Sequence, residues 1–396
     1  MNMIKSTVFK SMQKLHRTAN PVNNYLESLE WEGHIPFKVG MPNISQNCYV
    51  NASLQAFLAM PPFVSTMKMI GREYGYMIAH SPYMEPLQNM LDILAYAYSS
   101  DGRSYNNAIN RFLENLYISK SFGFRTIRNR QEDSKDFINS LNDYLDKMMT
   151  ILNAISQNLD APTESKNFFT RNFSFTRDVY KFCENMHDHV LPSRTNGILD
   201  IMVSGSDLQM EIKRHFSRKT LEYCISCGNA WPTINAQLSH YEKSTLTSLP
   251  DILGICLHFP LESQESGKKK HHTLFIQDTF AFDNVDESIL NYQYELISAI
   301  FHHGSSVDSG HYTSVSKNIY DCTWNHFNDS IINYDIKHMD YLNDPTFSNG
   351  QPYLLFYKKN EERLNQLVSD ETLTFFEAGA GKITCKYKLN EISFKI

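Results

Sequence analysis

Long apolar runs and a strong excess of one charge are both missing from this 396-residue sequence. No apolar stretch approaches the roughly 18 residues that a bilayer-spanning helix needs, so we expect no membrane span. The 37 lysine and arginine residues and 43 aspartate and glutamate residues give a formal net charge of −6. Because nucleic-acid binding depends on a positive surface, this balance gives no support to a nucleic-acid partner.

A disulfide framework is also missing. The cysteines are odd in number and scattered along the chain, unlike those of small secreted domains. We therefore expect free thiols in a reducing compartment, which means the cytoplasm or nucleus, or the host cytosol if the source is a virus or bacterium. The seven cysteines are Cys48, Cys183, Cys224, Cys227, Cys256, Cys322 and Cys385.

The chain has a helical first part and a strand-rich second part. Apolar residues recur at spacings of three and four after Cys48, around Met90, and between Phe137 and Met148. After about residue 165, apolar and polar residues alternate as in half-buried strands. Helices first and strands later predict an α+β fold rather than alternating βαβ units.

Cys48 stands at the start of a predicted helix, in the segment GMPNISQNCYVNASLQAFL. Backbone N–H groups and the positive end of the helix dipole stabilise a thiolate there, and the thiolate is the nucleophilic form. Asn43 lies five residues earlier and can donate from its amide to an oxyanion. Taken alone, the position fits either a nucleophile or a buried structural cysteine.

His311 can supply the base that a cysteine nucleophile requires. It follows Gly310 at the start of a predicted strand, and Asn328 and Asp329 come about 17 residues later. If the intervening turn forms a hairpin, one of these two residues returns to His311 and accepts its second N–H. The sequence therefore predicts a Cys/His/Asn or Cys/His/Asp arrangement.

These two segments resemble the cysteine and histidine boxes of the ubiquitin-specific proteases, which are papain-like cysteine proteases. The cysteine box, G-L-x-N-x-G-N-T-C-Y-M-N-S-x-L-Q, is matched in register by Gly40, Asn43, Cys48, Tyr49, Asn51, Leu54 and Gln55. The histidine box, with its following W-x-x-F-N/D-D, is matched by Tyr294, Leu296, Ala299, His302, Gly304, Gly310, His311, Tyr312, Trp324, Phe327, Asn328 and Asp329. The main departures are Ser45, Gln46 and Asn47, which we expect to alter the mobility of the loop while leaving the nucleophile intact.

The resemblance covers about residues 39–359 and implies an α+β, papain-like fold. A helical thumb (about 39–155), β-ribbon fingers (about 168–245) and a β-sheet palm in the remainder are expected. Residues 1–38 and 360–396 are then N- and C-terminal extensions.

The resemblance also implies a thiol-dependent deubiquitinase. It would hydrolyse the isopeptide or peptide bond after the C-terminal glycine of ubiquitin, acting on ubiquitin or ubiquitinated proteins and needing no cofactor for catalysis. Cys48 would be the nucleophile, His311 the base and Asn328 its orienting partner, with Asn43 and Asp329 assisting at the oxyanion and the histidine. A non-catalytic ubiquitin-binding protein and a protease for another ubiquitin-like modifier remain the alternatives.

A third matching segment, RQEDSKDFINSLNDYLD, resembles the helix that lies beside the ubiquitin-tail channel in this family. By that resemblance Asp133 would bind a tail arginine through its carboxylate. The alternative is a solvated charge on an amphipathic helix. The substrate-binding residues implied by the three segments are Gln131, Asp133, His302, Gly310 and Tyr312.

The pair Cys224 and Cys227 has the two-residue spacing that lets both thiolates bind one tetrahedral zinc ion. Cys183 and His187 are the nearest upstream candidates for the second pair, although three residues separate them instead of the two usual in the family. The four residues fall where the family carries its fingers, so the alternatives are one structural zinc or a metal-free β-ribbon, since many members have lost the metal.

Overall fold

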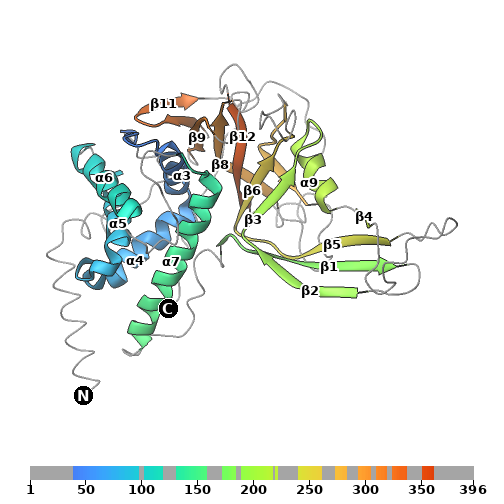
Figure 1. Ribbon diagram of the computed structural model, residues 1–396, viewed down its shortest axis with the longest axis horizontal. Coiled ribbons are helices and arrows are strands. Elements are labelled where there is room, and N and C mark those ends of the chain that lie inside the picture. Colours follow the sequence, from blue (N-terminus) through green and yellow to red (C-terminus); the bar gives the residue numbers. More distant parts are fainter. Residues whose placement is uncertain are drawn as a thin grey trace, which may run out of the picture.

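The structure is a computed structural model in which a helical lobe lies beside a large sheet, and a second sheet extends away from both (Figure 1). It describes residues 39–97, 102–118, 131–157, 172–183, 189–216, 219–221, 240–260, 273–282, 293–304, 309–318, 323–336 and 350–360. This arrangement confirms the predicted α+β class.

The helical lobe contains the described helices between residues 48 and 157. The helical runs expected around Met90 and between Phe137 and Met148 are α5 (Glu85–Ala97) and α7 (Ser134–Gln157). The run after Cys48 ends before Pro61 and Pro62, which occupy the first turn of the next helix. None of the described helices combines the length and hydropathy needed to cross a bilayer. The elements are α3 (Cys48–Leu58), α4 (Pro61–Ala79), η1 (Pro82–Met84), α5 (Glu85–Ala97), α6 (Gly102–Ile118) and α7 (Ser134–Gln157).

Helix α3 is buried over its whole length, including the polar residues Asn51, Ser53 and Gln55. It packs against α7 on one side and against strands of the large sheet on the other. A helix buried all round must satisfy its polar side chains internally. Ser53 does so by donating to the Tyr49 carbonyl and by a hydrogen bond to Ser134 at the start of α7.

The large sheet has eight strands in the order β11-β10-β9-β8-β12-β6-β3, with β7 paired to β8. All its described pairings are antiparallel except that of β3 with β6. One face packs on the helical lobe in a core that includes Phe57 and Phe356, and the other covers a second core. The strands are β3 (Ile198–Met202), β6 (Ile252–His258), β7 (Thr279–Ala281), β8 (Gln293–His303), β9 (His311–Lys317), β10 (Trp324–Asn328), β11 (Ile331–Ile336) and β12 (Gly350–Asn360).

The second sheet has four strands in the order β2-β1-β5-β4 and projects away from the helical lobe (Figure 1). Its strands are β1 (Phe175–Cys183), β2 (His189–Asn196), β4 (Lys219–Leu221) and β5 (His240–Ser248). Strand β3 and helix α9 (Leu208–Phe216) lie within the range expected for the fingers, but β3 joins the large sheet. Its buried residues, Ile198, Leu199 and Ile201, pack with the cores of that sheet, which explains the difference.

Candidate active site

Cys48 is the first residue of α3 and is only 3% exposed. The first turn of the helix contains no acidic side chain, and its N-cap residue, Asn47, makes no capping hydrogen bond with its side chain. The backbone N–H groups of Cys48 and Tyr49 instead interact with the thiol and lower its pKa. The position is the one at which a helix stabilises a thiolate.

Burial has the largest influence on Cys48 and raises the pKa of its thiol above its usual value. A hydrogen bond from the Tyr312 backbone N–H lowers this pKa, and the negative charge of Asp329 raises it. The net result is a raised pKa, so the thiol needs a base to become a nucleophile. The Tyr312 contact also places the sulfur beside the residue that follows His311.

His311 begins β9, and its Nε2 lies 2.7 Å from Oδ1 of Asn328 at the end of β10. Strands β9 and β10 pair antiparallel, so the predicted hairpin exists and brings the two residues together. Since an amide oxygen only accepts, Nε2 carries the proton in this contact. Nδ1 is thereby left as the nitrogen that can accept a proton from a thiol.

Asp329 lies in the turn between β10 and β11 and connects this turn to the loop before Cys48. Its Oδ2 accepts a hydrogen bond from Asn43 Nδ2 at 2.9 Å and lies 3.8 Å from His311 Nε2. Its Oδ1 accepts a hydrogen bond from Asn51 Nδ2 at 2.8 Å, and its backbone oxygen accepts one from the Met41 N–H at 2.9 Å. The nucleophile loop and the histidine hairpin are therefore fixed to each other through one residue.

Asn47 organises the loop that precedes the nucleophile, a role that the sequence did not indicate. Its side chain is completely buried, and its Oδ1 accepts hydrogen bonds from the N–H groups of Ile44 and Ser45 at 2.8 and 3.1 Å. Its Nδ2 donates to the Pro42 carbonyl at 3.0 Å and to Asn51 Oδ1 at 2.9 Å. The departure from the family pattern at this position thus supplies four hydrogen bonds that hold the loop.

Two glycines permit close approaches that a side chain would prevent. A Cβ on Gly40 would lie 2.3 Å from the Asp329 carbonyl oxygen, and one on Gly310 would lie 2.0 Å from the His303 carbonyl oxygen. Gln46 and Asp329 adopt positive φ angles of 59° and 50°, which costs non-glycine residues on the order of 1 kcal/mol each. The loop before Cys48 and the turn at Asp329 are therefore held by tertiary contacts rather than by the backbone preferences of their residues.

His326 is a second histidine in this region, and no motif in the sequence marks it. It lies on β10, two residues before Asn328, and Asn333 Nδ2 is 3.4 Å from its Nδ1. Burial, followed by the charge of His311, lowers the pKa of His326 to about 4. It is therefore neutral at pH 7 and does not oppose a positive charge on His311.

Asp133 caps α7 in the structure. Its Oδ1 accepts the N–H groups of Lys135 and Asp136 at 2.7 and 3.1 Å, and its Oδ2 accepts the Tyr353 hydroxyl at 2.6 Å. A carboxylate has about four acceptor positions, so one remains for another donor. This leaves room for a single hydrogen bond from an arginine, rather than a bidentate contact.

The other residues expected at the substrate lie just before α7, on β8, and at the start of β9. Gln131 Oε1 accepts the Gly310 N–H at 3.1 Å, which joins the start of α7 to the histidine loop. Tyr312 and His302 are each 4% exposed, and their rings are 4.7 Å apart. In the structure these two rings are therefore buried against each other instead of facing the solvent.

The expected zinc ligands fall largely outside the described residues. His187, Cys224 and Cys227 lie outside them, and Cys183 is described only as the last residue of β1. Within the described part of the chain, Asp200, Cys256 and His258 are the one group whose donor atoms are close enough to hold a metal ion.

Comparison with known proteins points to one family of hydrolases. Residues 39–357 match the family model described as ubiquitin carboxyl-terminal hydrolase. The chain is 25% identical over 359 residues to the probable ubiquitin carboxyl-terminal hydrolase 16 of Schizosaccharomyces pombe, a match that covers 88% of this chain and 73% of that protein. It is 24% identical over 321 residues to ubiquitin carboxyl-terminal hydrolase 48 of Rattus norvegicus, covering 74% of this chain and 28% of that protein.

The fold resembles that of solved structures at low sequence identity. A chain of the SAGA DUB module bound to ubiquitin aldehyde matches with a TM-score of 0.65 and 16% identity, over 85% of this chain and 72% of that one. A chain of the same module bound to monoubiquitin matches with a TM-score of 0.62 and 17% identity, over 84% of this chain and 71% of that one.

Proposed function

Since the chain belongs to the ubiquitin carboxyl-terminal hydrolase family and is a cysteine-type deubiquitinase of the ubiquitin-specific protease type, we propose that Cys48, His311 and Asn328 carry out its reaction. The observation that carries the assignment is the 2.7 Å contact between His311 Nε2 and Asn328 Oδ1, on the strand whose backbone also contacts the Cys48 thiol. This contact fixes the tautomer with Nδ1 available as the base.

The reaction begins when His311 Nδ1 takes the proton of the Cys48 thiol. The sulfur attacks the carbonyl carbon of the ubiquitin C-terminal glycine, and a tetrahedral oxyanion forms. When this intermediate collapses, the C–N bond breaks, His311 gives its proton to the leaving amine, and a thioester to Cys48 remains. Water then attacks the thioester with His311 as the base, which releases the carboxylate of ubiquitin and restores the thiol.

Asn43 and the backbone N–H groups at the start of α3 would stabilise the oxyanion. One hydrogen of the Asn43 amide is donated to Asp329, and an amide nitrogen carries two. We assign the second hydrogen to the oxyanion. Asp329 then has two tasks, because it positions Asn43 and its carboxylate lies 3.8 Å from the histidine that becomes charged.

The partner that these features support is ubiquitin or a ubiquitinated protein. Its C-terminal tail would pass between the helical lobe and the large sheet, beside Gln131, Asp133 and Gly310. The four-stranded sheet that projects from the large sheet would support the globular body of ubiquitin (Figure 1). We place the activity in the cytoplasm or nucleus, where a free thiol stays reduced.

The test is hydrolysis of a fluorogenic amide at the C-terminus of ubiquitin by the full chain. Cys48→Ala should remove the activity and leave ubiquitin binding intact, because the substitution deletes the nucleophile and little else. Cys256→Ala makes the same chemical change at the other buried free cysteine of the described residues and should keep activity within about threefold, a difference below 1 kcal/mol in barrier. Turnover that persists in the Cys48 variant would refute the assignment.

Two further measurements on the wild-type protein test the two alternative functions. Wild-type protein that binds ubiquitin without hydrolysing the amide would mark a non-catalytic binding protein. Wild-type protein that hydrolyses the amide of another ubiquitin-like modifier instead of that of ubiquitin would reassign the substrate.

A further inference from the structure

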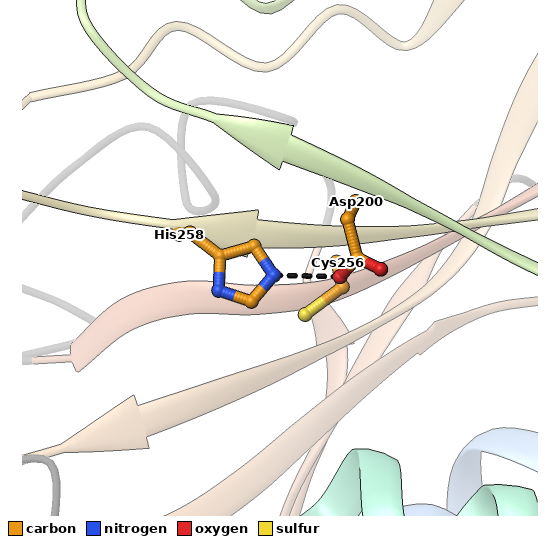
Figure 2. Close-up of side chains that lie close together, drawn as sticks. All are labelled: Asp200, Cys256 and His258. Carbon is orange, nitrogen blue, oxygen red and sulfur yellow. Dashed lines mark hydrogen bonds and ion pairs between the residues drawn. The ribbon is translucent and has the colours of Figure 1, made fainter.

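Three side chains with metal-ligand chemistry meet where β3, the last strand of the large sheet, pairs with β6 (Figure 2). Asp200 of β3 and Cys256 of β6 are direct partners in the parallel pair, and His258 follows Cys256 by two residues. Side chains two residues apart on a strand share a face, and so do directly paired residues. The pairing therefore places all three on one face without any contribution from a loop.

The donor atoms of the three side chains lie within 4.8 Å of one another, and His258 Nε2 is 2.6 Å from Asp200 Oδ1. Around a tetrahedral zinc ion, bonds of about 2.0–2.3 Å place the donor atoms roughly 3.3–3.6 Å apart. A small separation of the histidine from the carboxylate would thus make room for an ion. Figure 2 shows the sulfur, a carboxylate oxygen and a ring nitrogen converging on one region.

We propose that Asp200, Cys256 and His258 form a binding site for a borderline-soft divalent cation such as Zn²⁺, with three protein ligands and a fourth position open to water. Thiolate, imidazole and carboxylate together suit Zn²⁺ and Co²⁺, whereas Mg²⁺ and Ca²⁺ require oxygen ligands. Asp200 and His258 are 52% and 40% exposed, so an ion can enter from solvent. Cys256 is fully buried and would supply the inner ligand.

A second catalytic triad does not explain the cluster. In a triad, the carboxylate and the thiol use different ring nitrogens of the histidine. Here the carboxylate contacts Nε2, and the sulfur lies on the same side of the ring (Figure 2). Burial also raises the pKa of Cys256 to about 12, so its thiol becomes a ligand only when an arriving cation displaces the proton.

Lys135 is the group that opposes a cation at this site. Its Nζ lies 2.5 Å from Asp200 Oδ1, and it comes from the first turn of α7 in the helical lobe. The same carboxylate is held by His258 and Lys135, and these contacts lower the pKa of Asp200 to about 2. A cation must displace this ammonium group or use the other carboxylate oxygen, so removing the lysine should strengthen binding.

The experiment is a titration of the full chain with Co²⁺ alone, followed by displacement with Zn²⁺. A thiolate bound to Co²⁺ gives an absorption band in the near ultraviolet, which reports cysteine ligation directly. The band should be lost in Cys256→Ser, and His258→Gln should weaken Co²⁺ binding at least about tenfold. Lys135→Met should tighten binding by at least about threefold, because one positive charge is removed.

Other cysteines of the chain can also bind Co²⁺, so the comparison between variants decides the outcome. If Cys256→Ser and His258→Gln both keep the wild-type band, stoichiometry and affinity, the proposal is overturned. Near-ultraviolet circular dichroism checks that each variant is folded. Should Cys256→Ser fail to fold, His258→Gln and Asp200→Asn decide, because both residues are substantially exposed and each should weaken binding.

Discussion

Replacing Asn47 with alanine should loosen the loop that carries the oxyanion residue, and the structure allows the size of the effect to be worked out. Two of the four hydrogen bonds of the Asn47 side chain, to the Ser45 N–H and to Asn51, are buried, and the other two are partly buried. With about 1 kcal/mol for each buried bond and about 0.5 kcal/mol for each partly buried one, the loss is about 3 kcal/mol.

Two assays measure this loss. Urea unfolding of the Asn47→Ala variant should show a free energy of unfolding lower by about 3 kcal/mol. Hydrolysis of the ubiquitin amide should show kcat/KM lower by up to about a hundredfold, because the freed loop also carries Asn43. Ile44→Ala is the matched control, since Ile44 lies in the same loop and is 53% exposed. A change below about 0.5 kcal/mol in Asn47→Ala would contradict the role that we give this residue.

Three further predictions concern the same region. Gly310→Ala should lower activity at least about tenfold, because its Cβ would lie 2.0 Å from a backbone oxygen, whereas Gly197→Ala, with nothing within 4 Å, should not. Asn328→Ala should lower kcat about 10- to 100-fold with little change in KM. Asn328→Asp keeps an acceptor for His311 and should retain most of the wild-type kcat. Equal activity of the two variants would argue against an orienting role. The pKa of His326 is depressed to about 4, so the unfolded chain binds the extra proton between about pH 6.5 and 4 and stability falls as pH drops through that window. His326→Gln should remove at most about 3 kcal/mol of that fall, measured by urea unfolding at pH 7 and pH 4.5, and an unchanged pH dependence would contradict the burial argument.

The geometry of the candidate site was largely predictable because it depends on short segments. Cys48 at a helix start and His311 at a strand start each occupy a position that local sequence indicates, and hairpin pairing then brings Asn328 to the histidine. The α+β class followed from the order of helical and alternating patterns. Local patterns suffice where the required geometry spans one helix turn or one hairpin.

Longer-range features could not be read from the sequence. The parallel pairing of β3 with β6 joins segments about fifty residues apart, so the contact between Asp200 and His258 has no local signal. Asparagine is a common helix N-cap residue, so the sequence at Asn47 predicts an ordinary cap. Only the folded structure shows that the Asn47 side chain makes hydrogen bonds within the preceding loop and none to the backbone N–H groups of the helix end. Asp133 was expected at the substrate, and its capping of α7 was missed although an aspartate before a helix is a typical cap.

The most direct test of the central claim is labelling of the full chain with ubiquitin that carries an electrophile at its C-terminus, read by intact mass and peptide mapping. We predict that one ubiquitin is added, that it is attached to Cys48, and that labelling disappears in Cys48→Ala and slows strongly in His311→Ala. Attachment to any of the other six cysteines, or undiminished labelling of the Cys48→Ala variant, would contradict the account.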